Sequence, residues 1–133
     1  MYKTFKKDYA FGKNEEDDKF DLIKKVFGND LKKTNNFCKY DFFNDKYIIE
    51  LKSRNNNYNK FATTLLPADK ILKNIEQKQI FIFNFTDGLY YIEYDENKFN
   101  NYPNEKFVRN KRNDFNDLYK PYYYIPINDL IKI

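Results

Sequence analysis

The chain has 133 residues, of which 33% are charged and 41% hydrophobic, and its formal net charge is +4. It contains no histidine and a single cysteine, which excludes histidine-ligated metal centres, Ser-His and Cys-His nucleophiles, internal disulfides and cysteine-zinc clusters. The length predicts one domain over residues 1–133, with a core supplied largely by 14 phenylalanines and 13 tyrosines.

Signals for export or membrane insertion are missing from the sequence. No apolar run approaches the roughly 18 residues of a membrane span, and charged residues 1–7 are not followed by the apolar region of a signal peptide. The three glycines are too far apart to build a glycine-rich phosphate-binding loop. We therefore expect an intracellular protein, in the cytoplasm or nucleus, that is not secreted and has no membrane partner.

The first predicted element is an amphipathic helix over residues 13–27. Asn14 is suited to its N-cap, the first turn is acidic, and Gly28 ends it. Glu16 lies four residues before Phe20 and so extends the apolar stripe of the helix by one turn. Glu16 is therefore a candidate site residue that faces inward; the alternative is an ordinary acid that complements the helix dipole.

A β-hairpin is predicted next, from strands at residues 37–43 and 46–54 joined by an Asn-Asp turn. In this register Asp41 pairs with Ile48, and Glu50 lies diagonal to Asp41 on the same sheet face. Diagonal neighbours have Cα atoms roughly 7–8 Å apart, so both carboxylates can reach one divalent cation. The hairpin thus predicts a metal site with oxygen ligands.

Lys52 shares the sheet face of Glu50 and completes a Glu-x-Lys triplet. The triplet also occurs at Glu76 and Glu96, but only at Glu50 is it flanked by apolar strand residues and preceded by an acid at hairpin distance. This context distinguishes Glu50 and Lys52 from the other two triplets and places them with Asp41 on one patch. The alternative is a surface salt bridge of Glu50 with Lys52 or Lys39.

Further elements follow from periodicity and turn chemistry. We predict a helix at 67–77, strands at 79–85, 89–94 and 122–127, a short strand at 107–109 and a short terminal element at 128–133. The order α-β-β-α-β-β predicts an α/β fold with a central mixed sheet flanked by helices. Cys38, in the first strand of the hairpin, is predicted to be a small buried hydrophobe.

Two stretches, residues 52–60 and 106–112, contain bases and no acids. The loop that follows the proposed catalytic strand contains Arg54, Tyr58 and Lys60. Its cations and its aromatic ring could bind a nucleic-acid backbone. The alternative is a solvated loop, since the richness in Asn, Lys and Tyr throughout the chain is typical of an A/T-rich genome.

These residues and their order resemble the PD-(D/E)XK nuclease superfamily, which includes Holliday junction resolvases, restriction enzymes and small phage and viral nucleases. The resemblance covers roughly residues 10–94 and implies a restriction-endonuclease-like core. It is carried by the segments Phe11-Gly12-Lys13-Asn14-Glu15-Glu16, Tyr40-Asp41-Phe42, Ile49-Glu50-Leu51-Lys52-Ser53-Arg54 and Thr63-Thr64-Leu65-Leu66-Pro67-Ala68-Asp69-Lys70. Tyr40 stands where the family name has proline.

The resemblance implies roles for individual residues. In such nucleases, the carboxylates that match Asp41 and Glu50, with a backbone carbonyl near Leu51, hold one or two Mg²⁺ or Mn²⁺ ions. Lys52 is expected to orient or deprotonate the attacking water. Two further charged residues are implied to support the site: Glu16 at the metal and Lys70 at the phosphate or in the active-site network.

The expected function is therefore that of a metal-dependent DNA endonuclease in DNA repair, recombination or viral genome processing, acting inside a host cell. Branched DNA such as a four-way junction is the first substrate expected, and a homodimer goes with that substrate because a resolvase makes paired nicks. The alternative is a catalytically inactive nuclease fold that binds nucleic acid or serves as a scaffold. The residues do not distinguish DNA from RNA.

Overall fold

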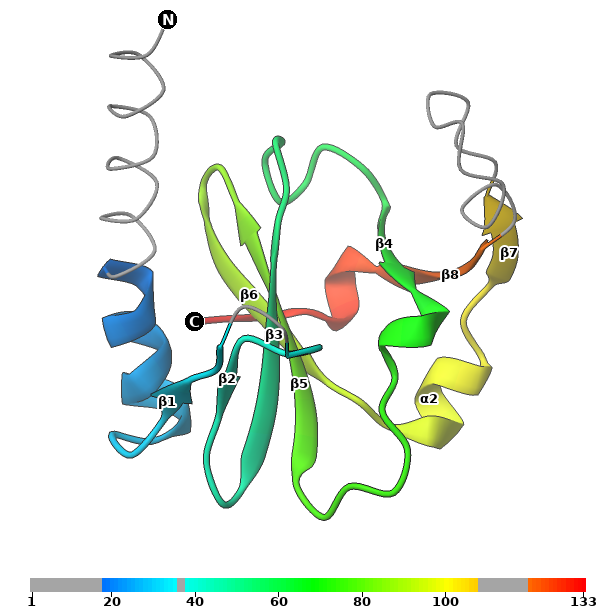
Figure 1. Ribbon diagram of the computed structural model, residues 1–133. Coiled ribbons are helices and arrows are strands. Elements are labelled where there is room, and N and C mark those ends of the chain that lie inside the picture. The colour runs from blue at the N-terminus through cyan, green and yellow to red at the C-terminus, as the bar shows by residue number, and fades with distance from the viewer. Residues whose placement is uncertain (1–17, 36–37, 108–119) are drawn as a thin grey trace, which may run out of the picture.

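The computed structural model describes residues 18–35, 38–107 and 120–133. These residues form two β-sheets (Figure 1). The larger has the order β1 (Lys32–Lys33), β2 (Phe42–Phe43), β3 (Tyr47–Ser53), β5 (Lys78–Phe85), β6 (Gly88–Glu93) and β9 (Ile131–Lys132). The smaller has the order β4 (Thr63–Pro67), β8 (Lys120–Pro126) and β7 (Asn104–Phe107). In the larger sheet β3 and β5 run parallel and the other neighbours antiparallel, so the predicted mixed sheet is confirmed.

A helix over residues 18–27 covers one face of the larger sheet. Ile23 and Phe27 are buried, and the ring of Phe20 stacks on Phe42 with 4.9 Å between centroids. Gly28 follows the helix with φ 131°, a conformation that side chains rarely adopt, and a Cβ there would lie 2.6 Å from Asp30 Oδ1. The predicted helix and its stop are confirmed over this part; residues 13–17, with Glu16, lie outside the described residues.

Strand β5 has apolar side chains on both faces, as predicted for a strand covered on two sides. Ile80 and Ile82 pack toward the helix at 18–27, whereas Phe81 and Phe83 pack toward the smaller sheet. All four have at most 1% of their surface exposed. The short helix α2 (Glu96–Asn100), which was not predicted, places Phe99 against the second of these two cores.

The predicted helix at 67–77 is wrong. Residues Thr63–Pro67 form β4, and only a 3₁₀ turn, η1 (Ala68–Lys70), follows it. Thr64 and Leu66 are buried on β4, which pairs with β8. Asn74, with φ 61°, is incompatible with a helix, and the carbonyl of Lys70 and the N–H of Leu72 bond to the side chain of Gln79 in place of helical partners. Tertiary contacts have thus overridden local helix propensity. The predicted order α-β-β-α-β-β therefore does not hold at its second helix.

Two smaller expectations also fail. Cys38 is exposed, because the chain bends over residues 38–41 and joins the sheet only at β2. A short strand was predicted at 107–109, but β7 begins earlier, at Asn104, and ends at Phe107; residues 108–119 lie outside the described residues. The strand predicted at 122–127 corresponds to β8, which is followed by the 3₁₀ turn η3 (Ile127–Asp129) and by β9.

In the described part of the chain, no helix has the length and apolarity needed to cross a membrane.

Candidate active site

The β2–β3 hairpin presents the predicted acids, but in a different register. Phe43 pairs with Ile48, not with Lys46, so the predicted pair of Asp41 with Ile48 is also wrong. The cause is Asn44, whose Oδ1 accepts hydrogen bonds from the backbone N–H groups of Lys46 and Tyr47 at 3.0 and 2.7 Å. The backbone N–H of Asn44 also donates to the carbonyl of Tyr47 at 3.0 Å, so the turn lies at Asp45 and Lys46, one residue later than predicted.

Asp41 is nevertheless held next to Glu50. Its backbone N–H donates to the carbonyl of Ile49 at 2.9 Å, and its carboxylate Oδ2 accepts from the backbone N–H of Leu51 at 2.7 Å. These two bonds bracket Glu50 and fix the exposed Asp41 side chain at the edge of β3. The hairpin therefore fixes the Asp41 carboxylate against the strand that carries Glu50.

Glu50 is buried in the middle of β3, between β2 and β5. Its Oε1 lies 2.9 Å from Lys52 Nζ and 3.4 Å from Lys70 Nζ, while only 8% of its side chain is exposed. A buried carboxylate is costly unless it is paired, and two ammonium groups offset this cost. The salt bridge between Glu50 and Lys52, which was the alternative prediction, does form. Glu50 is buried, however, and Lys70 is a second basic partner.

Lys70 reaches Glu50 from η1, which follows β4. Its backbone carbonyl accepts from Nε2 of Gln79 at 2.7 Å, and Gln79 Oε1 accepts from the N–H of Leu72 at 3.0 Å. Gln79 is buried at the start of β5, so one side chain clamps the segment that carries Lys70 onto the larger sheet. The sequence indicated Lys70 but contained no signal for Gln79.

The donor set of this site consists of oxygen atoms. Asp41, Glu50 and the carbonyl of Leu51 suit a hard cation such as Mg²⁺, which takes few carboxylates and keeps several waters. Within residues 18–35, 38–107 and 120–133, no group of three or more ligating side chains gathers at one point. A cation here would thus rely on two carboxylates with water and substrate, and it would compete with the lysines for Oε1 of Glu50.

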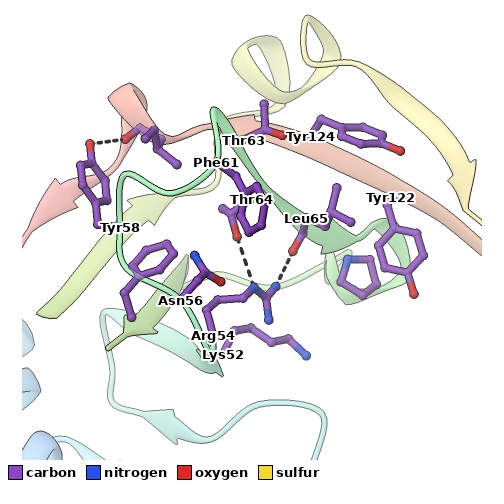
Figure 2. A pocket seen from close by; sticks show the side chains of 13 residues that line it. Lys52, Arg54, Asn56, Tyr58, Phe61, Thr63, Thr64, Leu65, Tyr122 and Tyr124 are labelled. Atoms are coloured by element: carbon purple, nitrogen blue, oxygen red, sulfur yellow. Dashed lines mark hydrogen bonds between the residues drawn. The ribbon is translucent and has the colours of Figure 1, made fainter. Parts of the chain in front are cut away.

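The residues predicted to bind nucleic acid have different environments. Arg54 is half-buried, its guanidinium donates to Thr64 Oγ1 at 3.2 Å and to the carbonyl of Leu65, and burial lowers its pKa (Figure 2). Its side chain thus ties β3 to β4. The Tyr58 ring stacks on Tyr90 with centroids 4.0 Å apart, and its hydroxyl donates to the carbonyl of Ile127 at 2.7 Å.

Lys60, by contrast, is exposed, with Nζ 5.5 Å from the ring centroid of Phe61. It belongs to the loop between β3 and β4, which also borders a cleft of about 510 Å³ (Figure 2). Side chains from both sheets and from this loop line the cleft, among them Lys52, Arg54, Asn56, Phe61, Tyr122 and Tyr124. The cleft therefore opens directly beside the Glu50 cluster, and the sequence did not indicate it.

The whole arrangement agrees with a comparison against protein-family models. Residues 9–133 match the model described as "Phage putative PDDEXK endonuclease". The chain belongs to this family. The matched range contains Glu16, Asp41, Glu50, Lys52 and Lys70. Membership of this family supports a nuclease as the general class of the protein. No curated protein and no solved structure gives a significant match to it.

Proposed function

We propose that this PDDEXK protein is a single-domain, metal-dependent DNA endonuclease with its active site at Asp41, Glu50 and Lys52. The observation that carries the proposal is the buried Glu50 carboxylate, 2.9 Å from Lys52 Nζ, on the strand whose Leu51 N–H holds the Asp41 carboxylate. Buried clusters of charged side chains are frequent at functional sites. Family membership supports phosphodiester cleavage as its chemistry.

The roles of the residues follow from this geometry. Asp41, Glu50 and the carbonyl of Leu51 would hold Mg²⁺ or Mn²⁺, which acidifies a bound water and stabilises charge on the phosphate. Lys52 would orient that water or accept its proton, directly or through Glu50. Lys70 would neutralise charge on the scissile phosphate, since it approaches Glu50 from the opposite segment. Glu16 would add a ligand from the first helix.

The phage family also supports a setting inside the host cell. We place the activity in viral genome processing, DNA repair or recombination, with branched DNA as substrate and a homodimer as the form that makes paired nicks. Selectivity for branched DNA would depend on the shape of the DNA. Lys60 and the positive stretch around it would contact the backbone near the site.

Wild-type protein is expected to nick supercoiled plasmid in Mg²⁺ or Mn²⁺ and to be inactive in EDTA, because the site lacks a nucleophile of its own. A labelled four-way junction is expected to be cut faster than linear duplex of the same sequence. Gel-based cleavage assays measure both. Binding of both DNAs without cleavage in any metal would contradict the proposal and favour the inactive, nucleic-acid-binding alternative.

Gln79→Leu is expected to lower the cleavage rate by about tenfold or more, the usual effect of removing a residue that orients an active-site group. Without Gln79, the carbonyl of Lys70 and the N–H of Leu72 lose their partner, and Lys70 is no longer held at Glu50. The measurement is a double-mutant cycle with Lys70→Ala. Gln77→Leu, at a half-buried position two residues away, is the control.

If Gln79 acts through Lys70, its substitution will have little further effect once Lys70 is alanine. Full additivity of the two effects would show that Gln79 acts independently of Lys70. Chemical denaturation of each variant measures the loss of folding free energy, about 1–3 kcal/mol for hydrogen bonds lost at a buried position, and shows whether each variant is folded in the cleavage assay.

A further inference from the structure

The cleft beside the active site has the dimensions of a ligand pocket. Its volume of about 510 Å³ lies within the range of roughly 300–1,000 Å³ that is typical of small-molecule sites. Lys52, which contacts Glu50 at 2.9 Å, forms one of its walls, and Phe61 and Tyr124 lie on other walls. Any group bound in this cleft would therefore lie next to the bond that the proposed nuclease cleaves.

The lining of the cleft is aromatic and cationic. None of the residues that line it is acidic. Its cations are Lys52 and Arg54. Besides Tyr58, its aromatic residues are Phe61, Phe85, Tyr122 and Tyr124. Polar groups are few, chiefly Asn56 and Thr63. Aromatic faces with cations nearby are what single-stranded nucleic acid binds, since every base has a face to stack and every nucleotide a negative charge.

Phe61 is the most informative residue of this lining. It is 56% exposed, the largest exposed fraction among the big hydrophobic side chains of the described residues. Lys60 Nζ lies 5.5 Å from its ring, which places a cation beside an aromatic face at the cleft. The other loop aromatic, Tyr58, is instead stacked on Tyr90 and bonded to the carbonyl of Ile127. Phe61 is thus the loop aromatic that can accept a stacking partner.

We propose that this cleft binds one unpaired nucleotide of the DNA substrate, with its base stacked on Phe61, next to the scissile phosphate. A base inside a duplex is stacked and paired and cannot enter such a cleft, so the site selects DNA with an unpaired nucleotide at the cleavage point. This inference rests on the proposed nuclease function. It narrows the substrate class to flaps, gaps, junction centres or single strands.

The test measures binding in EDTA, where the proposed cleavage cannot occur. Fluorescence anisotropy compares a labelled duplex, the same duplex with one unpaired 2-aminopurine nucleotide, and the single strand. Wild-type protein is expected to bind both unpaired forms more tightly than duplex and to quench 2-aminopurine fluorescence by stacking. Phe61→Ala is expected to weaken binding of the unpaired forms by about five- to one-hundred-fold, the range for one lost base–aromatic stack.

Phe61→Tyr, which keeps the ring, is expected to retain the preference and the quenching. Val26→Ala is the control, because Val26 is also exposed, at 46%, but lies on the helix at 18–27. Equal binding of duplex and unpaired DNA by wild-type protein would overturn the inference, and so would a preference that Phe61→Ala leaves unchanged. Because binding is measured without metal, a preference that depends on Phe61 would stand even if no cleavage were found. Cleavage without the preference would leave only the nuclease proposal standing.

Discussion

Glu50→Gln is expected to abolish binding of Mg²⁺ or Mn²⁺ and to slow DNA cleavage by on the order of 10³-fold or more, since metal catalysis supplies several kcal/mol of transition-state stabilisation. Glutamine has nearly the same shape, so the packing of the buried position is kept. What is lost is the negative charge that the metal needs and that holds Lys52 and Lys70 in place. Calorimetric titration with Mn²⁺ and single-turnover cleavage measure the two effects.

Two comparisons make this result specific. Glu93→Gln removes a carboxylate from the same sheet, where Glu93 is exposed and pairs with Lys78 at 3.7 Å, and it should change neither quantity. Lys52→Ala should lose cleavage while still binding metal, because Lys52 is not a metal ligand and its ammonium group competes with the cation for Glu50. Full cleavage by Glu50→Gln would rule out Glu50 as part of the active site.

Phe81→Ala is expected to lower the free energy of unfolding by about 3–5 kcal/mol, the usual cost of truncating a fully buried phenylalanine. Phe81 is 0% exposed at the centre of β5, beside Glu50 in the register of β3 and packed near the ring of Phe99. The loss is a large part of the roughly 5–15 kcal/mol that stabilises a typical domain. Urea denaturation followed by circular dichroism measures it.

Phe61→Ala is the matched control for this second experiment. The same side chain is removed from a position that is 56% exposed, so the free energy of unfolding should change by no more than about 0.5 kcal/mol. If the two substitutions destabilise the protein equally, the core between β5 and the smaller sheet is not packed as described. The control also shows whether the loss of base stacking expected for Phe61→Ala can be separated from a loss of folding.

Short-range patterns in the sequence were enough to predict that Glu50 and Lys52 lie on the same face of β3. Alternation along β3 separates Ile49 and Leu51, which pack toward the helix at 18–27, from Glu50 and Lys52. A change of two residues in the hairpin register keeps this separation, because side chains alternate with a period of two. The shift of the turn therefore leaves the predicted facing of Asp41 and Glu50 unchanged, and their shared metal site stays a prediction.

The amino-acid sequence by itself thus determined the described part of the first helix and its glycine stop, the doubly covered strand β5, and the pairing of Glu50 with Lys52 on one face of β3. Each of these depends on periodicity or turn chemistry within about ten residues. Only the tertiary structure decided that residues 63–67 are a strand, because their partner β8 is distant in sequence, with Thr63 opposite Pro126. With β4 in this place, Lys70 lies within ion-pair distance of Glu50 and Arg54 donates a hydrogen bond to Thr64. Residues of β4 and β8 also line the cleft at Phe61. Local patterns cannot encode such contacts, since their energy comes from side chains that meet only after the two sheets pack.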